Sequence, residues 1–112
     1  MIYQNVLEMI GNTKLLKLNR LSQKYKNHFY CKIEAGNPFG SVKDRVAFQI
    51  IHNAINNKQI NQNTTVIEAT SGNTGIAIAA VCLFYKIACI IVMPENMSAE
   101  RIKLLRHMLA KV

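Results

Sequence analysis

Residues 65–93 read TVIEATSGNTGIAIAAVCLFYKIACIIVM, and this stretch sets the architecture of the chain. It opens with an apolar run over 65–69, continues through a loop of small polar residues over 70–75, and enters an alanine-rich apolar segment over 76–85. A β-branched run over 88–93 closes it. Short apolar runs bounded by turn residues predict buried strands, and the alanine-rich segment predicts a helix buried on most sides. Continuous apolar strands joined by a helix are typical of a parallel sheet.

The residues before this stretch predict two further strands and one long helix. We expect strands over 15–18 and 28–33, with a basic loop or surface turn over 20–27 between them. The long helix begins at Ser41, whose hydroxyl caps the first turn while the carboxylate of Asp44 returns the hydrogen bond. Its buried face is predicted from apolar residues at helical spacing, namely Val42, Val46, Ala47, Ile50, Ile51 and Ala54.

The residues after the stretch predict one more helix, because Pro94 ends the last strand and Ser98 can cap a helix that runs to about Leu109. The predicted fold class is therefore α/β, a three-layer parallel sheet with helices on both faces. In such folds ligands bind at the carboxyl ends of the strands.

The composition fits a single packed domain. The chain has 112 residues, of which 50% are hydrophobic and 18% are charged, and this balance excludes intrinsic disorder. The net charge of +8 comes from basic residues spread over the whole length, which favours a basic surface over a nucleic-acid partner. We expect no membrane association and a cytoplasmic location. The cysteines lie in apolar runs without metal-site spacing, so we expect buried, reduced thiols at Cys31, Cys82 and Cys89.

Lys43 is the first candidate for chemistry. It lies in the first turn of the predicted long helix, where the positive end of the helix dipole disfavours an ammonium group and lowers the pKa of a lysine. A lysine whose amine is neutral can act as a nucleophile in Schiff-base chemistry. A solvated lysine beside Asp44 is the alternative, and the spacing of the residues alone leaves both interpretations open.

The loop over 70–75 is the second candidate. Gly72 and Gly75 allow the backbone to turn sharply, and the following helix presents unpaired N–H groups to whatever occupies the loop. Such a loop suits a carboxylate or a phosphate, and the amide of Asn73 can meet a phenolic or carbonyl oxygen. Hydroxyl donors come from Thr70, Ser71 and Thr74. An ordinary strand-to-helix turn with small polar residues is the alternative.

Several stretches resemble, in the same order, motifs of the cysteine synthase family. Residues 32–45, KIEAGNPFGSVKDR, strongly resemble the lysine motif of that family, and residues 68–75, EATSGNTG, resemble its substrate loop. Residues 93–98, MPENMS, together with the ER and LL pairs at 100–101 and 104–105, are similar to a third family segment. The start of the family is matched by residues 10–13, IGNT.

The resemblance implies a pyridoxal-phosphate enzyme of the tryptophan synthase β fold that converts O-acetylserine and sulfide into cysteine and acetate. It implies that Lys43 holds the cofactor as a Schiff base and then removes the α-proton of the substrate. Asn73 would hydrogen-bond the ring hydroxyl oxygen of the cofactor. The substrate carboxylate would be bound by Thr70, Ser71, Gly72 and Thr74. The family also implies a homodimer, serine acetyltransferase as a partner, and no metal.

The resemblance covers only the N-terminal part of the family, so it implies an incomplete fold. Residues 1–40 would lead into the larger domain, and residues 41–112 would form a truncated smaller α/β domain. The glycine-rich cup for the cofactor phosphate is absent, so we expect weak cofactor retention and little activity from the chain alone. Leu109 stands where the family has glycine, at a helix end that favours a left-handed residue, and residues 110–112 then begin an unfinished strand.

Two other functions remain open at this point. The chain could be a non-catalytic fragment that retains anion or partner binding. It could also belong to the cystathionine β-synthase branch, although the NPFG motif at residues 37–40 and the MSAER motif at residues 97–101 look more like the cysteine synthase branch.

Overall fold

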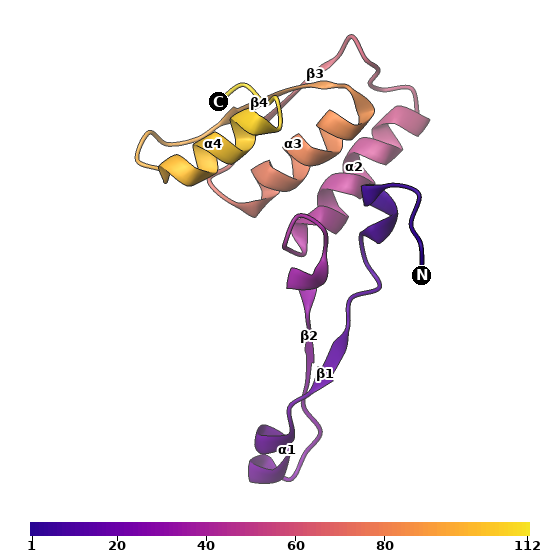
Figure 1. The fold of residues 1–112 in the computed structure, drawn as a ribbon, viewed down its shortest axis with the longest axis vertical. Helices are drawn as coiled ribbons and strands as arrows, with labels where there is room; N and C mark the ends of the chain where they lie inside the picture. Colours follow the sequence, from indigo (N-terminus) through magenta and orange to yellow (C-terminus); the bar gives the residue numbers. More distant parts are fainter.

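A strand–helix–strand unit forms the centre of the computed structural model, which describes residues 1–112 (Figure 1). Strand β3 (Thr65–Ala69) pairs in parallel with β4 (Ala88–Val92) along its whole length. Helix α3 (Asn73–Tyr85) connects the two strands and packs against both of them. The parallel strand pair and the connecting helix that the sequence predicts are therefore confirmed.

Two more helices complete the body around α3. Helix α2 (Lys43–Asn56) packs beside α3, and helix α4 (Ala99–His107) contacts α3 from another direction. The hydrophobic core lies where these three helices and β4 meet, and α3 contributes more buried residues to it than any other element. The core side chains with the lowest exposure are Ala47, Ala77, Ala79, Val81, Cys82, Ile91 and Leu105.

Helix α2 buries a narrower face than the sequence predicts. Ala47 and Ile51 lie in the core as expected, whereas Val42, Val46 and Ile50 are exposed. The prediction for these three residues is wrong because α3 covers only one side of α2, so a second apolar stripe on the same helix faces solvent.

The two cysteines of the body and the third cysteine lie in different environments. Cys82 of α3 and Cys89 of β4 are buried, as predicted, and a hydrogen bond between the thiols together with burial raises the pKa of Cys82. Cys31 is exposed, which contradicts the prediction that all three thiols are buried. Its apolar neighbours in the sequence lie in a hairpin that projects from the body instead of in the core.

This hairpin forms an arm that extends from one end of the body and accounts for the 55 Å length of the molecule (Figure 1). Strands β1 (Leu15–Lys17) and β2 (Tyr30–Lys32) pair antiparallel, and helix α1 (Asn19–Tyr25) lies at the tip. Both strands lie inside their predicted ranges, but the predicted loop over 20–27 is wrong. Its arginine, leucine, glutamine and lysine residues favour a helix, and Lys26 ends it in the left-handed conformation.

A polar cluster ties the base of the arm to α2. Nε of Arg45 in α2 donates to the Glu34 carboxylate at 2.8 Å, and this contact is the only ion pair of the chain. The Thr13 hydroxyl donates to the same carboxylate at 2.6 Å. Glu34 belongs to a short 3₁₀ helix (Glu34–Gly36) that follows β2, and a second one (Val6–Met9) precedes β1. The hydrogen bonds from Arg45 and Thr13 lower the pKa of Glu34 to about 2. The Glu34 carboxylate therefore remains ionised at neutral pH, and its contacts with Thr13 and Arg45 join the base of the arm to α2.

The last residues follow the predicted course. Leu109 adopts φ = 60°, the left-handed conformation expected after the last helix, and Lys111 forms a parallel bridge with Ile90 of β4. Residues 110–112 therefore begin a further strand beside β4, as predicted. None of the helices combines the length and the apolar character that crossing a membrane would require.

Gly75 is the position where α3 comes closest to the strand pair. A Cβ atom at this residue would lie 2.7 Å from Cγ2 of Thr70 and 3.3 Å from Cγ2 of Ile91. We expect Gly75→Ala to lower the free energy of unfolding by about 1–3 kcal/mol, because α3 must move away from β4 to make room. Urea unfolding followed by circular dichroism measures this change.

Gly36→Ala is the matched control, because a Cβ at Gly36 meets no atom within 4 Å. This variant should stay within about 0.5 kcal/mol of the parent chain. Equal stabilities for the two variants would show that the close approach of α3 to β4 does not exist.

Candidate functional site

The starts of α2 and α3 lie at the same edge of the body. Both helices run antiparallel to the strands, so they are parallel to each other, and their N-termini lie at the end from which the arm extends (Figure 1). This edge contains the carboxyl end of β3, where the sequence predicts a ligand site. The structure therefore brings the start of the lysine helix and the loop over 70–75 to one edge.

Lys43 is the first residue of α2, and its side chain faces solvent. The helix begins two residues later than Ser41, but the Ser41 hydroxyl still accepts a hydrogen bond from the backbone N–H of Lys43 at 3.1 Å. The only ion pair of this chain joins Arg45 and Glu34, so the ammonium of Lys43 has no acidic partner. Its amine is therefore free to reach a ligand at this edge.

Asp44 supports the turn that carries Lys43. The residue is fully buried, and one carboxylate oxygen, Oδ2, accepts a hydrogen bond from the backbone N–H of Phe39 at 2.6 Å. The other oxygen, Oδ1, is buried without a hydrogen-bond partner. Burial raises the pKa of Asp44. The hydrogen bond from Phe39 to Asp44 thus ties the loop before α2 to the first turn of this helix, next to Lys43.

Thr70 anchors the first end of the loop over 70–75. The N–H of Thr70 donates to the carbonyl of Val92 at 2.9 Å, and the hydroxyl of Thr70 accepts from Gly72 N–H at 3.3 Å. Helix α3 begins at Asn73, and no side chain caps its first turn. The Gly75 N–H donates to the Gly72 carbonyl at 3.1 Å, so the N–H groups of Asn73 and Thr74 remain available to a carboxylate or phosphate, as the sequence predicts.

Arg101 belongs to this edge, although the sequence analysis did not single it out. Its Nη1 atom donates to the carbonyl oxygen of Ser71 at 2.7 Å, which links the start of α4 to the loop. A cation in the first turn of a helix is poorly placed for stability, just as for Lys43. This position was the signal in the sequence that could have identified Arg101.

The groups at this edge suit a ligand that has a carbonyl carbon for an amine to attack, a hydroxyl oxygen on an aromatic ring, and a carboxylate. Lys43 offers a free amine, the exposed Asn73 offers an amide, and the uncapped start of α3 offers N–H donors. Pyridoxal phosphate joined to an amino acid has these features. The same edge offers no metal site, since no three histidine, cysteine or acidic side chains of the chain form a cluster.

Comparison with curated proteins gives relatives that cover nearly the whole chain. Cysteine synthase B from Campylobacter jejuni is 45% identical over 104 residues, which are 93% of this chain and 33% of that protein. Cystathionine beta-synthase from Apis mellifera is 44% identical over an alignment 113 positions long, which covers 99% of this chain and 22% of that protein. The chain thus spans about a third or less of the length of these relatives.

Comparison with solved structures gives the same fold. A hydrogen sulfide-producing enzyme from Fusobacterium nucleatum superposes with a TM-score of 0.92 at 42% identity, over 100% of this chain and 37% of its own. A cysteine synthase from Entamoeba histolytica superposes with a TM-score of 0.92 at 37% identity, over 99% of this chain and 34% of its own. The α/β fold of the tryptophan synthase β type, present in part, is therefore confirmed.

The sequence profile described as "Pyridoxal-phosphate dependent enzyme" matches residues 6–112. This match covers almost the entire chain and includes both Lys43 and the loop over 70–75. Together with cysteine synthases at up to 46% identity, it confirms the resemblance stated from the motifs. The chain belongs to the pyridoxal-phosphate dependent enzyme family.

Proposed function

We propose that this chain carries the lysine and the substrate loop of a cysteine synthase. The reaction replaces the acetoxy group of O-acetylserine with sulfide, and it yields cysteine and acetate. The observation that carries the proposal is the placement of Lys43 and of the uncapped start of α3 at one edge of the body. This arrangement supports a site in which the Lys43 amine and the N–H groups at the start of α3 serve the same ligand.

The residues of the loop over 70–75 have the role of binding and orienting the amino acid. The substrate carboxylate is bound by the first N–H groups of α3 and by the side chains or backbone of Thr70, Ser71, Gly72 and Thr74. Asn73 would donate its amide to the hydroxyl oxygen on the cofactor ring. Together these residues would bind and orient the amino acid near the start of α2.

Lys43 has two roles in the proposal. Its amine would hold pyridoxal phosphate, and the same amine would accept the proton from Cα of the substrate. Pyridoxal phosphate supplies the electron sink that makes this proton acidic and allows acetate to leave. Asp44 and Ser41 are positioning residues, because they hold the turn from which Lys43 extends.

The two parts of the chain belong to different domains in this proposal. Residues 1–40 form the segment that leads into the larger domain, and residues 41–112 form most of the smaller domain. The projection of the arm away from the body supports this division. The larger domain would supply the phosphate cup, so the chain alone should hold the cofactor weakly and turn over little.

The proposed partners are those that the resemblance to the cysteine synthase family implies. The complete enzyme would act as a homodimer in the cytoplasm and would meet serine acetyltransferase at the active-site edge. Sulfide is the proposed donor, and a cystathionine β-synthase activity is the alternative. The NPFG motif at residues 37–40 favours sulfide.

Covalent trapping tests the role of Lys43. The full chain is incubated with pyridoxal phosphate and then reduced with borohydride, and the modified lysines are located by peptide mass spectrometry. We expect the adduct to concentrate on Lys43, because it is the only lysine at the start of a long helix. Subsequent addition of O-acetylserine before reduction should lower this labelling.

Lys86→Ala is the matched control for Lys43→Ala, since Lys86 is also an exposed lysine at a helix end, but at the C-terminus of α3. The control should keep the Lys43 adduct, whereas Lys43→Ala should lose most of the total labelling. Adducts spread evenly over the lysines in all three proteins would contradict the assignment.

Arg101→Gln tests whether the hydrogen bond from α4 to Ser71 restrains the loop over 70–75. Loss of the hydrogen bond to Ser71 should raise the amide hydrogen exchange of residues 70–75 by about fivefold, while the urea midpoint of the whole chain stays unchanged. Arg106→Gln, in the last turn of the same helix, is the control and should leave the loop unaffected. Similar exchange in both variants would remove Arg101 from the site.

A further inference from the structure

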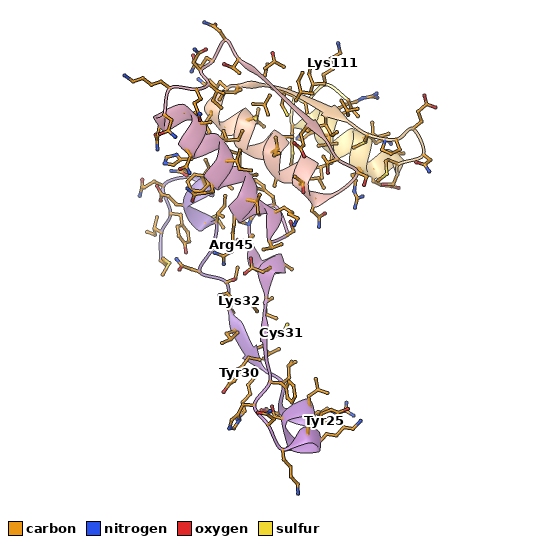
Figure 2. All side chains as sticks on the ribbon, turned by 180° about the vertical axis from the view of Figure 1, so that it is seen from behind. Tyr25, Tyr30, Cys31, Lys32, Arg45 and Lys111 are labelled. Carbon is orange, nitrogen blue, oxygen red and sulfur yellow. The ribbon has the colours of Figure 1, made fainter.

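The first turn of α2 depends on contacts outside the helix. The residue at its cap position is Val42, whose side chain cannot accept a hydrogen bond. A helix end without such a cap frays readily, and Lys43 is the first residue of this end. Two residues further on, the guanidinium of Arg45 reaches out of the helix to Glu34. Figure 2 shows Arg45 at the place where the arm meets the body.

The contact between Arg45 and Glu34 is bidentate. Nε of Arg45 donates to Oε2 of Glu34 at 2.8 Å, and Nη2 donates to Oε1 at 3.1 Å. The same Nη2 donates to the Thr13 hydroxyl at 3.0 Å. Two parallel hydrogen bonds between a planar guanidinium and a carboxylate fix orientation as well as distance, which a lysine ammonium cannot do. The contact therefore sets the direction in which the start of α2 faces.

The Glu34 carboxylate is itself fully held, because each of its two oxygens accepts two hydrogen bonds. Besides Arg45, its donors are the Thr13 hydroxyl at 2.6 Å and Nδ2 of Asn37 at 2.9 Å. Asn37 is buried, and its Oδ1 accepts the N–H of Gly11 at 2.8 Å. A Cβ at Gly11 would lie 3.0 Å from Nη1 of Arg45, so this glycine also makes room for the guanidinium. The polar cluster thus joins three segments of the chain at one point.

Stability alone does not account for an arginine at this position. A cation in the first turn of a helix is opposed by the helix dipole. The exposed fraction of the Arg45 side chain is 40%, and solvent screening weakens an ion pair at such exposure. The ion pair therefore adds little to the stability of the whole chain, whereas its geometric effect falls on the turn that carries Lys43.

We propose that Arg45 and Glu34 are positioning residues for the chemistry of Lys43. By fixing the first turn of α2 against the base of the arm, they keep the Lys43 amine directed at the ligand edge. Thr13 and Asn37 hold the Glu34 carboxylate in the orientation that Arg45 requires. The inference rests on the proposed function, because the direction of the Lys43 amine matters only if this amine meets a ligand.

The test uses three variants of the full chain and two controls. Arg45→Lys keeps the charge but loses the bidentate contact, Glu34→Gln keeps the size, and a third variant combines both changes. Arg106→Lys is the matched control, since Arg106 lies in the last turn of α4 and forms no ion pair. Ile51→Val controls for lost stability, because it shortens a buried side chain further along α2.

Two measurements are made on each protein. Amide hydrogen exchange of residues 43–45 reports the order of the first turn without any cofactor. Incubation with pyridoxal phosphate, borohydride reduction and peptide mass spectrometry give the labelling of Lys43 relative to Lys86. Because both lysines belong to the same molecule, this ratio is insensitive to a change in the unfolded fraction of the chain.

We expect the labelling ratio to fall about fivefold in each single variant, and to fall no further in the double variant, since the two residues act through each other. Exchange of residues 43–45 should rise about fivefold in the same three variants. The two controls should stay within about twofold of the parent chain in both measurements.

The contrary outcomes separate this inference from the proposed function. A parent chain that labels Lys43 and Lys86 equally would overturn the proposed function, and the positioning role with it. A high ratio in the parent chain that Arg45→Lys and Glu34→Gln both retain would overturn the positioning role alone, even if exchange rises. An equal loss of labelling in Ile51→Val would also overturn it, because lower stability would then explain the effect.

Discussion

The close packing of α3 against the strand pair is the constraint on which the rest of this structure depends. Gly75 leaves room for Thr70 and Ile91, and a series of alanines allows the helix to lie between α2 and the strands with the run from Ala77 to Cys82 buried. Because α3 returns from β3 to β4, its start must lie at the carboxyl end of β3. Helix α2 packs beside it in the same direction, so Lys43 and Asn73 lie at the same edge.

This edge combines features that would be unfavourable in a purely structural element. Lys43 and Arg101 place cations in the first turns of helices, where the helix dipole disfavours them. Asp44 is a buried carboxylate with one oxygen unpaired. The first turn of α3 has no capping side chain. Residues that break local rules together at one edge support the ligand site that we propose, and the matching family is described as pyridoxal-phosphate dependent.

Sequence patterns predicted the body well and the arm less well. The strand over 65–69 and the buried helix after it follow from local patterns that agree with the packing, and both are present. The exposure of Val46 and Cys31 could not be predicted, because it depends on which faces neighbouring elements cover. Helix α1 was missed because its residues are mostly basic or polar, a composition that is also typical of a surface turn, although several of them favour a helix. Arg101 reaches Ser71 across a separation of 30 residues, a contact that no local pattern encodes.

The relative direction of α2 and α3 is the most direct test of this account. Spin labels are placed on a cysteine-free background at two pairs of exposed positions, Lys43 with Asn73 and Asn56 with Asn73, and the distances are measured by double electron–electron resonance. The 43–73 pair should be markedly shorter, since Asn56 lies at the other end of α2, roughly 20 Å along its axis. A 43–73 distance equal to or longer than the 56–73 distance would separate the lysine from the loop and contradict the account.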